Sequence, residues 1–264
     1  MNNAPLGVFD SGIGGLTVAR ALFERLPQES VIYFGDTARV PYGPKSPDTV
    51  RRYSGEILAY LLQRGVKAVV VACNTSTAHA LGFLQERSPV PVVGVIEPGA
   101  RAAVAATRTG TIGVIGTAGT IASGAYERAI KALRADARVN SQPCPLLVPL
   151  VEEGWFEHPA AELIAREYLE PLKRAKVDVL VLGCTHYPLL KPLLARVMGP
   201  DVKLVDSAEE TATVVSRQLE RLDLLSNGGN HEHRFVVSDD EPHFRKVGAL
   251  FLGETLKQVE VAPL

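Results

Sequence analysis

The chain has 264 residues, enough for one large domain or two small ones with a sizeable buried core. Hydrophobic residues make up 46% and charged residues 22%, and the formal net charge is -1 at pH 7. This balance is typical of soluble globular proteins and lacks the basic excess that nucleic acid or an anionic membrane surface would attract. We therefore expect neither kind of partner.

We expect no targeting signal in the early part of the chain. Its longest apolar run, residues 6–9, is too short and wrongly flanked for a signal peptide or a membrane span. The three cysteines lack CxxC spacing and do not form a disulfide framework. Free thiols persist in a reducing compartment, so the sequence predicts a cytoplasmic protein.

Short β-branched runs alternate with helical patterns along most of the chain. Strands are predicted at residues 7–9, 31–34, 68–73, 92–95, 111–115, 177–182, 203–205 and 234–237. Apolar residues at three-to-four-residue spacing predict helices at 16–26, 49–63, 77–87 and 242–252. Residues 69–71 are apolar at consecutive positions, which indicates a strand buried on both faces of a parallel sheet. The predicted fold class is α/β.

Two stretches of the chain end in a cysteine in the same way. When residues 66–75 are placed over 177–186, an apolar run, a small residue, the thiol and then polar residues coincide, so Cys73 matches Cys184. A second echo places residues 7–14 over 113–120, and each stretch follows a strand with a turn rich in small and hydroxyl residues. Each half of the chain therefore carries a strand, a polar turn and a later strand ending in cysteine.

This repetition predicts where a ligand binds. Open α/β sheets bind ligands beyond the carboxyl ends of their strands, and all four repeated motifs lie at such ends. Two halves with facing strand ends would bring both thiols to one small ligand. Residues 97–99 are predicted as a turn where the chain crosses between the halves, and 206–207 as its return.

The two thiols suit acid/base chemistry. Cys73 precedes Asn74, Thr75 and Ser76, which are good N-cap residues, and a helix N-terminus lowers the pKa of a thiol from about 8.5. Either thiol alone is more simply explained as a small buried hydrophobe. Cys144, between two prolines, is interpreted in that way, whereas the matched pair favours catalysis. Metal binding by the two thiols with His186, or a redox disulfide, stays an alternative.

Two polar turns accompany the thiols. The glycine-rich turn after Asp10 suits anion binding by backbone N–H groups, but Thr17 replaces the glycine of a dinucleotide fingerprint and no GK[ST] follows. A carboxylate is therefore the favoured anion, and Asp10 is either a helix cap or an acid/base assistant. The turn at residues 35–43 is either a binding loop or an ordinary surface turn, and its Arg39 is either a carboxylate clamp or a structural ion pair.

Six motifs taken together resemble those of the glutamate racemases in the aspartate/glutamate racemase superfamily. They are DSGxGG at 10–15, GDTARxPYG at 35–43, ACNT at 72–75, GVIEPG at 94–99, GTxGT at 116–120 and GCTHYP at 183–188. The likeness covers essentially the whole chain. It implies interconversion of L- and D-glutamate without pyridoxal phosphate, metal or other cofactor, supplying D-glutamate for peptidoglycan in the bacterial cell wall.

The resemblance also implies an architecture. Two flavodoxin-like parallel-sheet domains are related by pseudo-two-fold symmetry, with the active site in the cleft between them. The first domain comprises residues 1–97 and 208–264, and the second, inserted domain comprises 98–207. The implied assembly is a homodimer.

Site roles are implied position by position. Cys73 takes the α-proton of D-glutamate and Cys184 that of L-glutamate, and the helpers of the thiols are Asp10, His186 and Glu152. The implied substrate contacts are Asp10, Ser11, Pro41, Tyr42, Gly43, Asn74, Thr75, Thr117, Thr120, Thr185 and His186. Two rival functions stay open, namely racemisation of aspartate or a related acid and simple binding of a dicarboxylate by a two-lobed protein.

Overall fold

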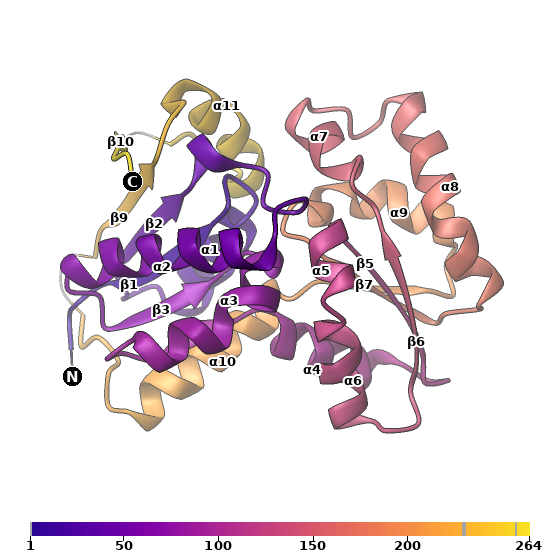
Figure 1. The fold of residues 1–264 in the computed structure, drawn as a ribbon, viewed down its shortest axis with the longest axis horizontal. Coiled ribbons are helices and arrows are strands. Elements are labelled where there is room, and N and C mark those ends of the chain that lie inside the picture. The colour runs from indigo at the N-terminus through magenta and orange to yellow at the C-terminus, as the bar shows by residue number, and fades with distance from the viewer. Residues whose placement is uncertain (1, 229–230, 257) are drawn as a thin grey trace.

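The computed structural model describes residues 2–228, 231–256 and 258–264, which form two parallel sheets side by side (Figure 1). The larger sheet has the strand order β10-β9-β2-β1-β3-β4. Its strands are β1 (Leu6–Asp10), β2 (Val31–Gly35), β3 (Ala68–Val71), β4 (Val92–Gly94), β9 (His233–Val237) and β10 (Val259–Val261). The smaller sheet has the order β6-β5-β7-β8. Its strands are β5 (Thr111–Gly116), β6 (Arg138–Pro143), β7 (Val179–Gly183) and β8 (Lys203–Val205).

Helices cover both faces of each sheet. Those that begin in the larger-sheet half are α1 (Leu16–Arg25), α2 (Pro47–Gln63), α3 (Asn74–Arg87), α10 (Ala208–Arg221) and α11 (Glu241–Leu252). Those that pack on the smaller sheet are α4 (Ile96–Ala106), α5 (Ala118–Ala122), α6 (Ala125–Leu133), α7 (Leu147–Glu152), α8 (Pro159–Arg174) and α9 (Lys191–Met198). Single 3₁₀ turns lie at Thr37–Arg39 and Tyr187–Leu190.

Side chains of alternate strand residues enter different cores. In β1, Val8 joins a core with α1, α10 and α11, whereas Phe9 joins a second core with α2 and α3. In β5, Val114 packs with α4 and α6, and Ile115 packs on the opposite face. Strands buried on both faces explain the consecutive apolar residues of the sequence. The predicted α/β class with two parallel sheets is confirmed.

The four strands of the smaller sheet have the same order as the last four strands of the larger sheet, β2-β1-β3-β4. In the larger sheet β1 lies between β2 and β3, and in the smaller sheet β5 lies between β6 and β7. The repeated stretches of the sequence therefore occupy matching places, with each cysteine following the strand next to the central one. The tail returns to the larger sheet because β9 pairs in parallel with β2. This pairing agrees with a discontinuous first domain, whose boundaries at 97/98 and 207/208 stay a prediction.

Some local predictions were wrong. The strand predicted to reach Cys73 ends at Val71, because α3 begins at Asn74 and Cys73 is its N-cap. The turn predicted at residues 97–99 is the first part of α4, since Pro98 fits the first turn of a helix, where its missing N–H costs no hydrogen bond.

Candidate active site

Both matched thiols line one small cavity between the facing strand ends of the two sheets. Its volume is about 30 Å³, which is room for about two water molecules. The loops that follow β1, β2, β3, β5 and β7 supply most of its wall. The lining residues are Ser11, Val40, Pro41, Tyr42, Gly43, Cys73, Asn74, Thr75, Thr117, Val148, Cys184, Thr185 and His186.

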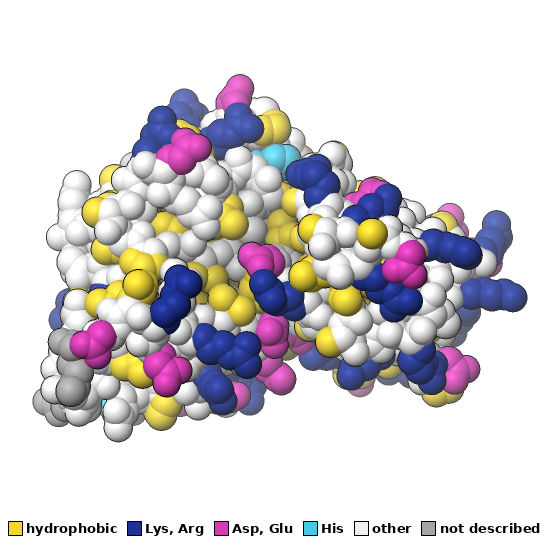
Figure 2. Space-filling model, turned by 90° about the horizontal axis from the view of Figure 1, so that it is seen from below, with side chains coloured by type: hydrophobic (Ala, Val, Ile, Leu, Met, Phe, Trp, Pro, Cys, Tyr) yellow, Lys and Arg dark blue, Asp and Glu magenta, His cyan; other side chains and the backbone are white. Residues whose placement is uncertain are grey.

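A larger groove, of about 400 Å³, lies away from the thiols against α3, β4, α4 and α10. Figure 2 shows the face of the molecule seen from below, with hydrophobic side chains in the hollow between charged ones. The groove is lined by residues such as Val93, Glu97 and Arg217, and it contains neither a thiol nor a histidine. We therefore place the chemistry in the smaller cavity, where the titratable groups converge.

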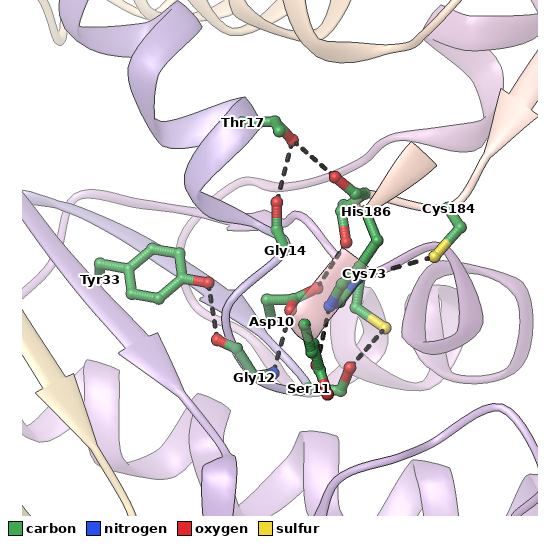
Figure 3. Close-up of polar contacts among 11 residues, drawn as sticks. Asp10, Ser11, Gly12, Gly14, Thr17, Tyr33, Cys73, Cys184 and His186 are labelled. Atoms are coloured by element: carbon green, nitrogen blue, oxygen red, sulfur yellow. Dashed lines mark hydrogen bonds and ion pairs between the residues drawn. The ribbon is translucent and has the colours of Figure 1, made fainter. Parts of the chain in front are cut away.

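Cys73 caps the helix that follows it. Its Sγ accepts a hydrogen bond from the N–H of Ser76 at 3.4 Å and lies 3.7 Å from Ser11 Oγ (Figure 3). Burial raises the pKa of the Cys73 thiol to about 11, and the charge of Asp10 acts in the same direction. The expected lowering by the helix N-terminus is present through Ser76, but burial outweighs it, so this thiol is protonated at neutral pH.

Cys184 faces a buried histidine. His186 Nδ1 lies 3.8 Å from Cys184 Sγ, and its Nε2 lies 2.9 Å from Glu152 Oε1. Burial opposes a charge on His186, but the contacts with Cys184 and Glu152 raise its pKa to about 10. Glu152 is also desolvated, yet its contact with His186 lowers its pKa below the ordinary value. His186 is thus an imidazolium held between a carboxylate and a sulfur, and Phe251 meets its ring edge-on at 5.6 Å.

Asp10 lies beneath the cavity and links the two halves. Its carboxylate accepts the N–H of Gly12 at 3.0 Å, and Thr185 Oγ1 lies 3.5 Å from its other oxygen. Burial raises its pKa, although the charge of His186 works against that rise. Asp10 therefore contacts the surroundings of both thiols without lining the cavity.

Close packing explains why the turn after β1 is rich in glycine. A Cβ on Gly14 would come within 2.4 Å of His186 Nδ1 and of Thr185 Oγ1, and a Cβ on Gly15 would come within 2.5 Å of the Asp10 Cβ. The start of α1 thus approaches the loop after β7 so closely that only glycine fits. The predicted role of this turn in anion binding gains no support from these contacts, which instead describe packing between the halves.

Hydroxyl groups from both halves meet at a second point of the cavity. Thr75 Oγ1 lies 2.9 Å from Thr117 Oγ1 and 3.2 Å from Thr120 Oγ1. Thr117 lines the cavity, whereas Thr120 is buried behind it. Of the predicted site residues, Asp10, Thr120 and Glu152 therefore lie behind the cavity wall, and the others form it.

The loop that carries Tyr42 is fixed by a buried carboxylate that the sequence did not single out. Asp36 accepts hydrogen bonds from the Tyr42 hydroxyl, from Arg39 Nε at 2.7 Å and from Ser238 Oγ at 2.8 Å. The proton of the Tyr42 hydroxyl is thus directed to Asp36. Arg39 does not line the cavity and forms the structural ion pair that was one of its two interpretations.

Two apolar residues of the wall, Val40 and Val148, were not among the predicted contacts. Their positions in the sequence could have identified them, because Val40 precedes the predicted contact Pro41 and Val148 lies one helical turn before Glu152 on α7. All three cysteines are free thiols. Among residues 2–228, 231–256 and 258–264, no group of three or more His, Cys, Asp or Glu side chains is arranged to hold a metal ion. Within the same ranges, no helix is both long and apolar enough to cross a membrane.

Replacing Gly14 by Ala tests the close approach between the halves. Because the added Cβ has no space beside His186 and Thr185, Gly14→Ala should lower the free energy of unfolding by about 1 to 3 kcal/mol. Gly82→Ala is the matched control, since nothing lies within 4 Å of a Cβ on Gly82 and alanine favours its helix by up to about 1 kcal/mol. Urea denaturation measures both variants. Equal effects in the two would contradict the steric account.

The charge on His186 predicts a pH dependence of stability. Folding raises the pKa of His186 from 6.5 to about 10, so its stabilisation is fully present below pH 6.5 and is lost as the pH rises toward 10. The difference in unfolding free energy between the wild type and His186→Asn should therefore be greatest near pH 6 and shrink by pH 10. Urea denaturation across this range measures it, and a difference that grows with pH would refute the imidazolium assignment.

Comparison with known proteins places the chain in a family. The family model described as Asp/Glu/Hydantoin racemase matches residues 15–215. A glutamate racemase from Geobacter metallireducens is 56% identical over 257 residues, which cover 96% of this chain and 94% of the relative. The solved structure of glutamate racemase isoform RacE1 from Bacillus anthracis superposes with a TM-score of 0.96 at 42% identity, covering 100% of this chain and 99% of that one.

A further solved structure, a glutamate racemase from Francisella tularensis in complex with D-glutamate, has a TM-score of 0.94 and 40% identity, covering 99% of this chain and 98% of that one. These matches confirm the predicted resemblance to glutamate racemases. The chain therefore belongs to the Asp/Glu/Hydantoin racemase family, and with it to the amino-acid racemases, which are isomerases.

Proposed function

We propose that this protein interconverts L- and D-glutamate by a two-thiol mechanism that uses no cofactor. The observation that carries the proposal is the pair of thiols at matching strand ends on one cavity, Cys73 from the larger-sheet half and Cys184 from the smaller. Cys144, the third thiol, is buried outside this cavity. We assign glutamate as the substrate because the relatives are named glutamate racemase, and one of them was solved in complex with D-glutamate.

The proposed chemistry inverts the α-carbon of the amino acid. In one direction Cys184 acts as a thiolate and takes the α-proton of L-glutamate, leaving a carbanion. The thiol of Cys73 then delivers its proton to the opposite face, which yields D-glutamate, a Cys73 thiolate and a Cys184 thiol. The reverse direction exchanges the two roles, as general acid–base catalysis requires.

The electrostatics of the site fit a resting state poised for L-glutamate. The thiol of Cys73, with its pKa raised to about 11, holds the proton that the carbanion needs. The imidazolium of His186 lies beside Cys184 Sγ and attracts negative charge there. Glu152 holds that imidazolium, and Asp10 contributes charge near Cys73. His186, Glu152 and Asp10 therefore assist the thiols.

Stabilisation of the carbanion requires donors and the exclusion of water. Hydroxyl groups of Ser11, Thr75, Thr117 and Thr185 face or surround the cavity, and we assign them with Asn74 to the substrate. Thr120 supports Thr75 and Thr117 from behind. Pro41, Tyr42 and Gly43 form the adjoining wall.

The cavity as it stands is narrow for a dicarboxylic amino acid, since ligand pockets commonly reach about 300 Å³ or more. We infer that the halves separate to admit glutamate and then close over it. Closure would exclude water at the moment when the carbanion forms. The finer choice between glutamate and aspartate depends on the wall shape, because one methylene changes binding by roughly 1 to 3 kcal/mol.

The wider biological role follows the proposed reaction. D-glutamate serves the peptidoglycan of the bacterial cell wall, so the protein would act in the cytoplasm during cell wall biogenesis and thereby contribute to cell shape. The proposed assembly is a homodimer.

Replacing each cysteine by serine tests the mechanism. In a polarimetric assay with L-glutamate and no added cofactor, the wild type should lose optical rotation toward zero. Cys73→Ser and Cys184→Ser should each lower kcat by about 100-fold or more, because serine is a far weaker acid and base than cysteine. Cys144→Ser is the matched control and should keep the wild-type rate.

Three outcomes would count against this account. A wild type that binds glutamate in calorimetry without changing its rotation would be a binding protein, and initial rates higher on aspartate than on glutamate would change the substrate. Cys73→Ser or Cys184→Ser retaining more than about a tenth of the wild-type kcat would remove that thiol from the mechanism.

A further inference from the structure

One polar group on the cavity wall has no hydrogen-bond partner among the residues that the structure describes. Asn74 follows Cys73 directly and begins α3, and only 3% of its surface is exposed. Within the part of the chain that the structure describes, its side-chain Nδ2 makes no hydrogen bond. Because a buried amide donor left without an acceptor is costly, this group is expected to meet an acceptor when the cavity is filled.

The other end of the same amide is held from the opposite half of the molecule. The hydroxyl of Tyr126, on α6, donates a hydrogen bond of 2.7 Å to Asn74 Oδ1. The Tyr126 ring is buried and wedged between two glycines, since a Cβ on Gly99 would come within 3.1 Å of its hydroxyl and a Cβ on Gly183 within 3.0 Å of its ring. The position of the phenol is therefore fixed.

The direction of this hydrogen bond sets the orientation of the amide. An amide oxygen can only accept a hydrogen bond, so the Tyr126 hydroxyl is the donor in this contact. The Tyr126 proton is then directed to Asn74 Oδ1. With its oxygen held by Tyr126, the amide has its NH₂ group left to donate to a ligand.

We propose that Tyr126 is a positioning residue that orients Asn74 so that its NH₂ group binds a carboxylate oxygen of the substrate. This inference rests on the proposed function, which supplies an anionic substrate for a donor that has no partner. The bond also spans the two halves, so the donor is presented in this orientation only when they are closed. Tyr126 itself does not line the cavity.

The test is a double-mutant cycle on racemisation kinetics with glutamate. Tyr126→Phe keeps the ring and removes only the hydroxyl, so Asn74 loses its fixed orientation while the thiols stay in place. KM for both enantiomers should rise about tenfold, the effect of losing one well-placed hydrogen bond to a charged group, with kcat changed less than about threefold. In an Asn74→Ala background, the same substitution should raise KM by less than about twofold.

Tyr187→Phe is the matched control. Tyr187 is also buried, but its hydroxyl donates to the Cys144 carbonyl at 2.9 Å rather than to Asn74. Its effect on KM should be the same in the presence and absence of Asn74. Tyr126→Phe acting equally in both backgrounds, or leaving KM unchanged, would overturn the proposal. Inactivity of the wild type on glutamate would instead defeat the proposed function.

Discussion

The approach of the glycine turn after β1 to the loop after β7 is the contact on which the rest of the site depends. A side chain at Gly14 would occupy the space of His186 and Thr185, so its absence lets the two sheets meet at their carboxyl ends. Parallel sheets gather their loops at those ends, and the shared strand order gives each sheet a cysteine there. The repeated strand order supplies the two thiols. Because Gly14 has no Cβ, the residues around the two thiols can approach one another.

The two halves are alike in backbone but different in charge. Cys73 lies in a buried setting with Asp10 nearby, which raises its pKa and keeps it protonated. Cys184 faces His186, whose own pKa is raised by its contacts with the thiol and Glu152. The cavity thus has an acid on one side and a site for negative charge on the other. This arrangement suits a reaction that removes a proton from one face of the α-carbon and adds a proton to the opposite face. Symmetry thus provides the geometry, and local electrostatics would provide a direction for the first turnover.

Much of this arrangement was predictable from the sequence, because buried parallel strands are long apolar runs and the two cysteine motifs repeat. The strand β6 was missed, since it lies at the edge of its sheet and its residues Arg138, Asn140 and Gln142 are polar. The helix-start effect on Cys73 was foreseen, but its burial was not, because burial depends on the opposite half. Asp36 and Tyr126 were missed for the same reason, as their partners Ser238 and Asn74 are distant in the chain.

The central claim is that two different thiols serve the two faces of the α-carbon, and solvent deuterium tests it most directly. Racemisation is started from pure L-glutamate in D₂O, and separately from pure D-glutamate, and deuterium at the α-carbon is measured in product and recovered substrate at early times. The account predicts deuterium in the product of each reaction, with recovered substrate still carrying hydrogen. Deuterium appearing equally fast in recovered substrate and product would indicate one shared base and contradict the account.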